Sequence, residues 1–160
     1  MTDNATEHKK GTVMKRIINE MKLRLPALSV NEALSRSVIS AFAAELNPRV
    51  EELGDLRCAV SEAVTNCIVH AYRNLRAGSI GFIYISARLY DSREISVEIS
   101  DNGCGIEDVE LARQPAFTTG DDGERCGMGF LVMESFMDSV SVKSRLGKGT
   151  TVLMRKKLKP

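Results

Sequence analysis

Three polar side chains recur at four-residue intervals inside one apolar stretch of the sequence. Glu62, Asn66 and His70 belong to a pattern that predicts a long helix from about Val50 to about Asn74, and their spacing places them on one face of it. A carboxylate and an amide are costly to bury without partners, so this face is a candidate ligand site. The polar edge of an ordinary amphipathic helix would give the same spacing. The other faces carry an apolar stripe that must pack on a core: Leu56, Ala59, Val60, Ala63, Val64, Cys67 and Ile68.

Three glycine motifs follow downstream. Asp101-Asn-Gly-Cys-Gly105 comes directly after a predicted strand, where an aspartate can accept a hydrogen bond from an exocyclic amine and glycines let the backbone approach a ligand. Gly127-Met-Gly129 opens a predicted helix, whose first backbone N–H groups can bind phosphate. Gly147-Lys-Gly-Thr150 precedes the last predicted strand. Taken singly, each motif is also explained by a turn, a helix start or a hairpin.

Hydrophobic periodicity predicts the elements that must position these motifs. The predicted fold class is α+β, a two-layer sandwich of helices on a mixed, mostly antiparallel sheet, with one domain over residues 17–160 and a flexible polar tail at 1–16. The predicted strands are 17–28, 80–89, 95–101, 140–142 and 150–158, and the other predicted helices are 32–46, a short turn at 109–112, and 127–137.

Composition excludes several classes of protein. The 160 residues are 43% hydrophobic and 27% charged, with a formal net charge of +1, which does not indicate a nucleic acid or an anionic membrane as a partner. No apolar run reaches the roughly 20 residues needed to span a bilayer. The four cysteines (Cys58, Cys67, Cys104 and Cys126) form no C-x-x-C pair. They indicate reduced thiols in the cytoplasm, and a zinc site is disfavoured.

The order of the motifs is far more specific than any one of them. E-x-x-x-N on a helix, D-x-G-x-G after a strand, G-x-G at a helix start and G-x-G-T before the last strand resemble the Bergerat-type ATP-binding fold of gyrase, Hsp90 chaperones, histidine kinases and MutL. The resemblance covers residues 23–158. Segments 61–71, 112–119 and 124–130 resemble the sporulation branch of the anti-sigma factor family of serine kinases. The stress-response branch is a weaker match, through the Phe-Thr-Thr and Gly-Met-Gly-Phe segments.

The resemblance implies an ATP/ADP site with Mg²⁺. Glu62 would be the catalytic base that orients a serine hydroxyl, Asn66 would give an oxygen to Mg²⁺, and Asp101 would read the adenine amino group. The loop at 113–125 would form a lid. The implied nucleotide-binding set also contains His70, Gly103, Gly105, Thr119, Arg125, Gly127, Met128, Gly129 and Thr150. For His70, packing of the helix is an equally good interpretation.

The resemblance also implies partners. They are a sporulation sigma factor of the sigma F type, an anti-anti-sigma factor as phosphorylation substrate, and a second copy of the chain in a homodimer paired near the N-terminal strand. Arg36 on the helix 32–46 would contact both protein partners, and no nucleic acid or membrane is bound directly.

Three other interpretations of the same motifs differ in what the chain does. A stress-response serine kinase stays open, and so does a nucleotide-gated module that binds a sigma factor without transferring phosphate. Such a module needs Asn66 and the glycines but not the carboxylate of Glu62. A histidine kinase fragment fits poorly, since His8 and His70 are the two histidines of the chain.

Overall fold

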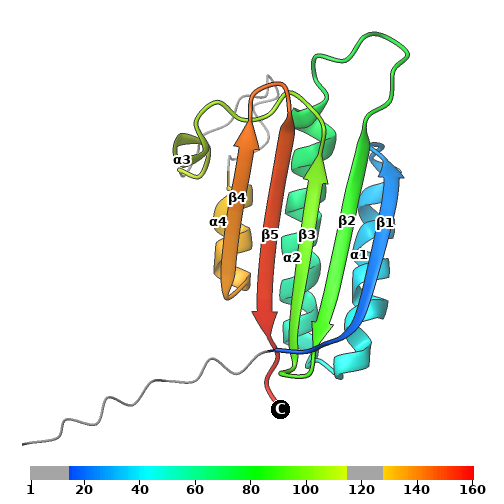
Figure 1. The fold of residues 1–160 in the computed structure, drawn as a ribbon, viewed down its shortest axis with the longest axis vertical. Coiled ribbons are helices and arrows are strands. Elements are labelled where there is room, and N and C mark those ends of the chain that lie inside the picture. Colours follow the sequence, from blue (N-terminus) through cyan, green and yellow to red (C-terminus); the bar gives the residue numbers. More distant parts are fainter. Residues whose placement is uncertain (1–14, 115–127) are drawn as a thin grey trace, which may run out of the picture.

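Five strands form one sheet in the order β1-β2-β3-β5-β4 (Figure 1). The computed structural model describes residues 15–114 and 128–160. The strands are β1 (Ile17–Pro26), β2 (Phe82–Tyr90), β3 (Glu94–Asp101), β4 (Ser139–Arg145) and β5 (Gly149–Lys157). Every pairing between these strands is antiparallel. The predicted α+β sandwich is confirmed, and its sheet is antiparallel throughout the part of the chain that the structure describes.

Three helices cover one face of this sheet, with α2 between α1 and α4 (Figure 1). The helical elements are α1 (Val30–Ala43), a 3₁₀ turn η1 (Ala44–Leu46), α2 (Val50–Asn66), a π-helical turn η2 (Cys67–Ala71), α3 (Val109–Ala112) and α4 (Gly129–Phe136). The long central helix therefore ends at Ala71, a few residues before the predicted end near Asn74. None of the helices in the described ranges is long and apolar enough to cross a membrane.

The core lies between α2 and the inner face of the sheet. The predicted apolar stripe of α2 is buried from Leu56 to Cys67, whereas Ile68 is only half-buried. On β2 the residues that alternate inward are fully buried, as the two-residue period requires: Ile83, Ile85, Ala87 and Leu89. Since α2 carries both this stripe and the polar face, its packing on the sheet sets the position of the polar face.

Polar contacts near the N-terminal end of α2 fix its position. Glu52, in the first turn, accepts hydrogen bonds from the backbone N–H groups of Arg49 (2.9 Å) and Lys159 (2.8 Å). The Nζ atom of the buried Lys156 donates to Asp55 of α2 (3.1 Å) and to the carbonyl oxygen of Phe136 at the end of α4 (2.7 Å). The helices α2 and α4 are thereby tied to the end of β5.

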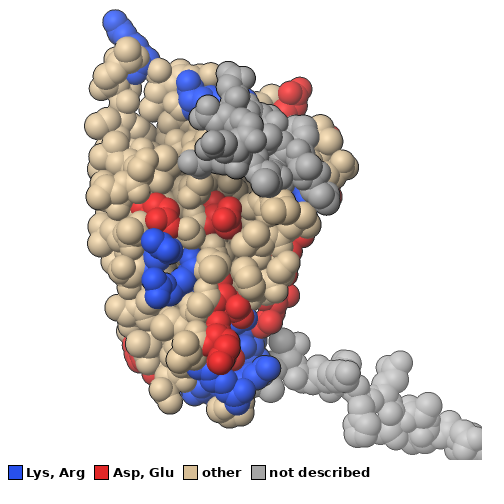
Figure 2. All heavy atoms as spheres, turned by 180° about the vertical axis from the view of Figure 1, so that it is seen from behind, with Lys and Arg blue, Asp and Glu red and all other residues tan. Residues whose placement is uncertain are grey.

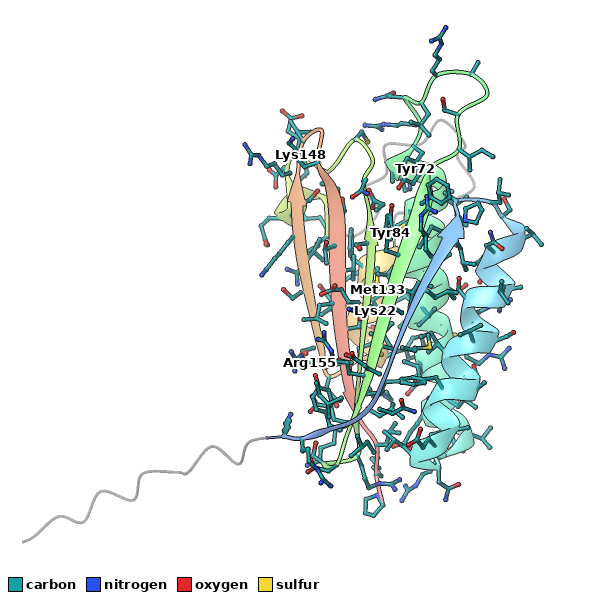
Figure 3. The ribbon with its side chains drawn as sticks, turned by 45° about the vertical axis from the view of Figure 1, so that its right-hand side comes forward. Lys22, Tyr72, Tyr84, Met133, Lys148 and Arg155 are labelled. Atoms are coloured by element: carbon teal, nitrogen blue, oxygen red, sulfur yellow. The ribbon has the colours of Figure 1, made fainter. Side chains whose placement is uncertain are left out.

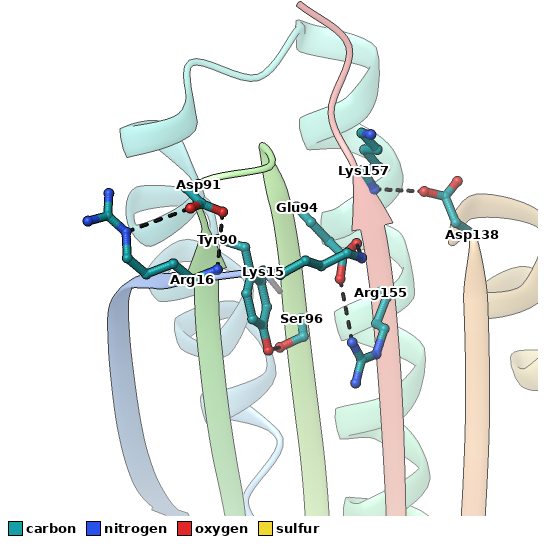
Figure 4. Close-up of polar contacts among 9 residues, drawn as sticks. All are labelled: Lys15, Arg16, Tyr90, Asp91, Glu94, Ser96, Asp138, Arg155 and Lys157. Atoms are coloured by element: carbon teal, nitrogen blue, oxygen red, sulfur yellow. Dashed lines mark hydrogen bonds and ion pairs between the residues drawn. The ribbon is translucent and has the colours of Figure 1, made fainter. Parts of the chain in front are cut away.

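The outer face of the sheet is polar where the chain enters β1 (Figure 4). Glu94 is buried there and forms an ion pair with Lys15. Its Oε1 atom also lies 3.5 Å from a guanidinium nitrogen of Arg155. The backbone N–H group of Arg16 donates to Asp91 (3.2 Å). These contacts join the start of β1 to the β2–β3 turn and to β5.

Candidate functional site

A cavity of about 1150 Å³ opens between α2, the ends of β3 and β5, and the start of α4. Its wall is completed by residues 104–112, which run from the loop after β3 through α3. The cavity is large enough for a ligand of the size of a nucleotide, since ligand sites commonly measure about 300–1,000 Å³. The predicted site residues that line it are Glu62, Asn66, His70, Asp101, Gly105, Met128, Gly129 and Thr150. The fold thus brings together motifs that are far apart in the sequence.

Glu62 and Asn66 both point toward the first residue of α4. A Cβ atom placed on Gly129 would lie 3.1 Å from Oε2 of Glu62 and 3.4 Å from Oδ1 of Asn66. The lack of a side chain at Gly129 therefore lets these two half-buried groups approach the N-terminus of α4. Backbone N–H groups at a helix N-terminus favour anions. A carboxylate and an amide oxygen beside such a terminus are suited to a ligand that combines phosphate with a cation.

Asp101 lies at the end of β3 with a buried carboxylate whose two oxygens have different neighbours. Oδ1 accepts hydrogen bonds from the backbone N–H groups of Gly103 (2.8 Å) and Thr150 (3.3 Å). Oδ2 lies 3.7 Å from the Sγ atom of Cys67, which donates to it. Burial raises the pKa of Asp101 above its usual value, although these three hydrogen bonds act in the opposite direction. The result is a hydrogen-bond acceptor held in the wall of the cavity.

The comparisons with known proteins agree with this geometry. The family model described as histidine kinase-like ATPase domain matches residues 25–156. The anti-sigma F factor of Caldanaerobacter subterraneus subsp. tengcongensis is 53% identical over 138 residues, which are 86% of this chain and 93% of that protein. The anti-sigma F factor of Clostridium acetobutylicum is 48% identical over 139 residues, or 87% of this chain and 94% of that protein.

The chain belongs to the anti-sigma F factor family, within the histidine kinase-like ATPase domains.

Solved structures show that the same fold occurs beyond the anti-sigma F factor family. The RsbU and RsbW domains of Rv1364c from Mycobacterium tuberculosis match with a TM-score of 0.64 at 19% identity, covering 89% of this chain and 33% of that one. The blue-light activated histidine kinase EL346 of Erythrobacter litoralis matches with a TM-score of 0.55 at 19% identity, covering 76% and 40% of the two chains. At these identities the likeness concerns the fold alone.

Several predicted residues of this anti-sigma F family member are not placed in the cavity. Thr119, Arg125, Gly127 and most of the predicted lid lie outside the described residues. Gly103 does not line the cavity. Arg36 lines a second hollow of about 350 Å³ between α1, α2 and α4, and Glu62 borders both hollows. On this helix face, acidic and basic side chains lie side by side (Figure 2).

The structure shows why glycine occupies both glycine positions of the D-x-G-x-G motif, which the sequence did not reveal. A Cβ atom on Gly103 would overlap with the carbonyl oxygen of Ala71, and one on Gly105 would overlap with that of Arg145. Gly105 also has a φ of +74°, which side chains disfavour. The sequence predicted that these glycines leave room for a base. In the structure they leave room for neighbouring backbone, which holds the loop after Asp101 against η2 and the β4–β5 turn.

Two residues were missed by sequence reasoning. Cys67 was assigned to the core, but its thiol also contacts Asp101. The hydroxyl of Tyr72 donates to the carbonyl oxygen of Phe82 and accepts from the backbone N–H of Asn102 (3.0 Å), at the same end of the sheet as Tyr84 (Figure 3). A Cβ atom on Gly81 would overlap with the Tyr72 ring, so this glycine makes room for the ring. Neither contact has a signal in the sequence, because the paired residues belong to different elements.

Proposed function

We propose that this chain is an anti-sigma factor that binds and inhibits a sporulation sigma factor of the sigma F type. We further propose that it is an ATP-dependent serine kinase, which phosphorylates and thereby inactivates an anti-anti-sigma antagonist. The observation that carries the proposal is the approach of Glu62 and Asn66 to Gly129 at the N-terminus of α4. The names of the related proteins support the anti-sigma role.

The residues of the cavity fit a nucleotide. Oδ2 of Asp101 has acceptor capacity left for the adenine amino group, because its neighbour Cys67 is a weak donor. Thr150 lines the same wall and gives its backbone N–H to Asp101. The phosphates would lie at the backbone of Met128 and Gly129. Thr119, Arg125 and Gly127, which the sequence also predicts to bind the nucleotide, would complete this part of the site.

The residues present also fit Mg²⁺ bound together with phosphates. Mg²⁺ commonly takes one or two protein oxygens and keeps several waters. Oδ1 of Asn66, beside the start of α4, would supply such an oxygen. No cluster of three or more His, Cys, Asp or Glu in residues 15–114 and 128–160 is arranged to hold a metal by itself, which agrees with a cation that arrives with the nucleotide. When bound, the ion neutralises charge on the phosphate oxygens.

Glu62 would act on the acceptor hydroxyl. It borders the large cavity and also the hollow on the helix face, so a serine that enters from that face can reach its carboxylate. Glu62 accepts the serine proton while the serine oxygen attacks the terminal phosphorus and the bond to the leaving diphosphate breaks. His70 lines the cavity about two turns after Glu62, where it would contact the nucleotide.

Replacing Asp101 by asparagine is expected to weaken ATP binding by about 10- to 100-fold. A hydrogen bond to a charged group contributes about 1.5–3 kcal/mol, and the amide can present a donor where an acceptor is needed. Isothermal calorimetry measures the affinity. Asp91→Asn makes the same chemical change on the exposed β2–β3 turn and should bind ATP like the wild type. An unchanged affinity in Asp101→Asn would contradict the assignment of the adenine site.

Replacing Arg36 by alanine is expected to weaken binding of both protein partners by about tenfold or more, because arginines are frequent energetic centres of interfaces. Arg36 lines the hollow that Glu62 also borders, and its Nε atom lies 2.9 Å from Oε1 of Glu32. ATP affinity should not change. Arg88→Ala, on the outer face of the sheet, is the control. Intact capture of both partners by Arg36→Ala in a pull-down would rule out this contact.

We expect a homodimer that pairs near β1. This strand lies at an edge of the sheet and exposes Ile17 and Ile18, and an edge strand with exposed apolar residues favours pairing with another chain. Light scattering at micromolar concentration should give twice the chain mass of 17.6 kDa. The mass of a single chain under these conditions would contradict the dimer.

A further inference from the structure

Oδ2 of Asp101 receives one hydrogen bond from a side chain in the described structure. Its partner oxygen, Oδ1, is held by two backbone N–H groups that follow from the shape of the loop and the strand. The contact of Oδ2 comes instead from Cys67, on the helix that faces β3 across the cavity. The thiol therefore joins the two walls of the cavity at the atom that would meet an adenine amino group.

Cys67 is chemically suited to this contact. It is 5% exposed, so its thiol is shielded from water although it lines the cavity. Burial, and after it the charge of Asp101, raise the pKa of the thiol well above its usual range, so the sulfur keeps its proton and remains a donor. An S–H group is a weak donor, and the carboxylate oxygen keeps a lone pair for a second donor.

We propose that Cys67 is a positioning residue that aims Oδ2 of Asp101 at the amino group of the bound purine. The inference rests on the proposed nucleotide site. It adds to that site a residue that acts through Asp101 and does not itself bind the purine amino group. Without the thiol, Asp101 can still be held by Gly103 and Thr150 through Oδ1, but rotation of the carboxylate is less restricted. A ligand amine must then order the carboxylate on binding, which lowers its affinity.

The alternative is that Cys67 is only a small apolar filler, as buried free cysteines often are. Cys67→Val tests this alternative directly, because it keeps an apolar side chain of similar size and removes the donor. Cys67→Ser keeps a donor and loses some apolar character. If Cys67 is only a filler, valine preserves the ATP affinity better than serine does. If its thiol is a positioning donor, serine preserves the ATP affinity better than valine does.

Cys67→Val is expected to weaken ATP binding about three- to tenfold, the effect of losing one modest hydrogen bond, and Cys67→Ser should stay within about twofold of the wild type. Three further measurements separate positioning from general damage. A purine nucleoside triphosphate without the 6-amino group should bind equally to Cys67→Val and the wild type. In an Asp101→Asn background, Cys67→Val should cause no further loss. The melting temperature of each variant shows whether it is folded, and Cys67→Ala replaces valine if that variant does not fold.

The possible outcomes distinguish this inference from the proposed function. If the wild type binds ATP, Asp101→Asn loses it and Cys67→Val binds like the wild type, the positioning role is wrong and the nucleotide site stands. Equal losses of the two triphosphates in Cys67→Val would likewise overturn it, since the effect would not depend on the amino group. If the wild type itself does not bind ATP, both the proposed nucleotide site and the positioning role of Cys67 are wrong.

Discussion

Glu62→Gln is expected to slow phosphorylation of the antagonist by about 10²–10⁴-fold, the usual contribution of a general base. The amide keeps the shape of the side chain beside Gly129 but cannot take up the serine proton at neutral pH. Binding of ATP and of the sigma factor should persist, because neither needs a proton acceptor. A single-turnover assay with radiolabelled ATP, followed by mapping of the labelled residue, measures the transfer.

Two control variants define what the loss in Glu62→Gln means. Glu107→Gln removes the same charge from the cavity wall, on the segment before α3, and should phosphorylate at the wild-type rate. Asn66→Ala should instead damage Mg·ATP binding and with it every nucleotide-dependent function. A wild-type rate in Glu62→Gln would show that the carboxylate is structural. The general-base role of Glu62 would then have to be abandoned. Absence of phosphate transfer by the wild type itself would instead favour the nucleotide-gated module that binds a sigma factor.

Gly149→Ala is expected to lower the free energy of unfolding by about 2–6 kcal/mol. This estimate combines a strained backbone, which costs about 1–3 kcal/mol, with overpacking of about 1–3 kcal/mol. Gly149 opens β5 with a φ of +92°, and a Cβ atom there would overlap with the carbonyl oxygen of Asp101. Because Asp101 must move away, ATP affinity should also fall. Denaturant unfolding and calorimetry measure the two effects.

Two other glycines separate the causes of this loss. Gly147 has a φ of +71° but open space around it, so Gly147→Ala reports the strain without the overlap. Gly54 lies within α2 with no atom in the way, and Gly54→Ala should stabilise the protein by about 0.5–1 kcal/mol through helix propensity. Equal losses for Gly149→Ala and Gly147→Ala would contradict a role for the contact with Asp101.

The sequence by itself determined the elements and the set of site segments. The apolar stripe of α2 and the two-residue alternation of β2 and β3 depend on neighbours along the chain, so periodicity alone predicted them. Their bounds differ from the predicted ones. The strand β1 ends at Pro26 and the central helix at Ala71, because contacts with the rest of the fold set these ends. The order of the motifs also predicted that Glu62, Asn66 and Asp101 share one cavity, which the structure shows.

Only the tertiary structure decided which atoms meet. The contact of Cys67 with Asp101, the packing of Tyr72 on Gly81 and the closeness of Gly103 to Ala71 join elements whose separation in sequence carries no fixed geometry. These contacts depend on where α2 lies on the sheet and how its last turn widens into a π-helix. A pattern of residue types records which side chains can be buried. The distance between two such groups is decided by the packing of the elements that carry them.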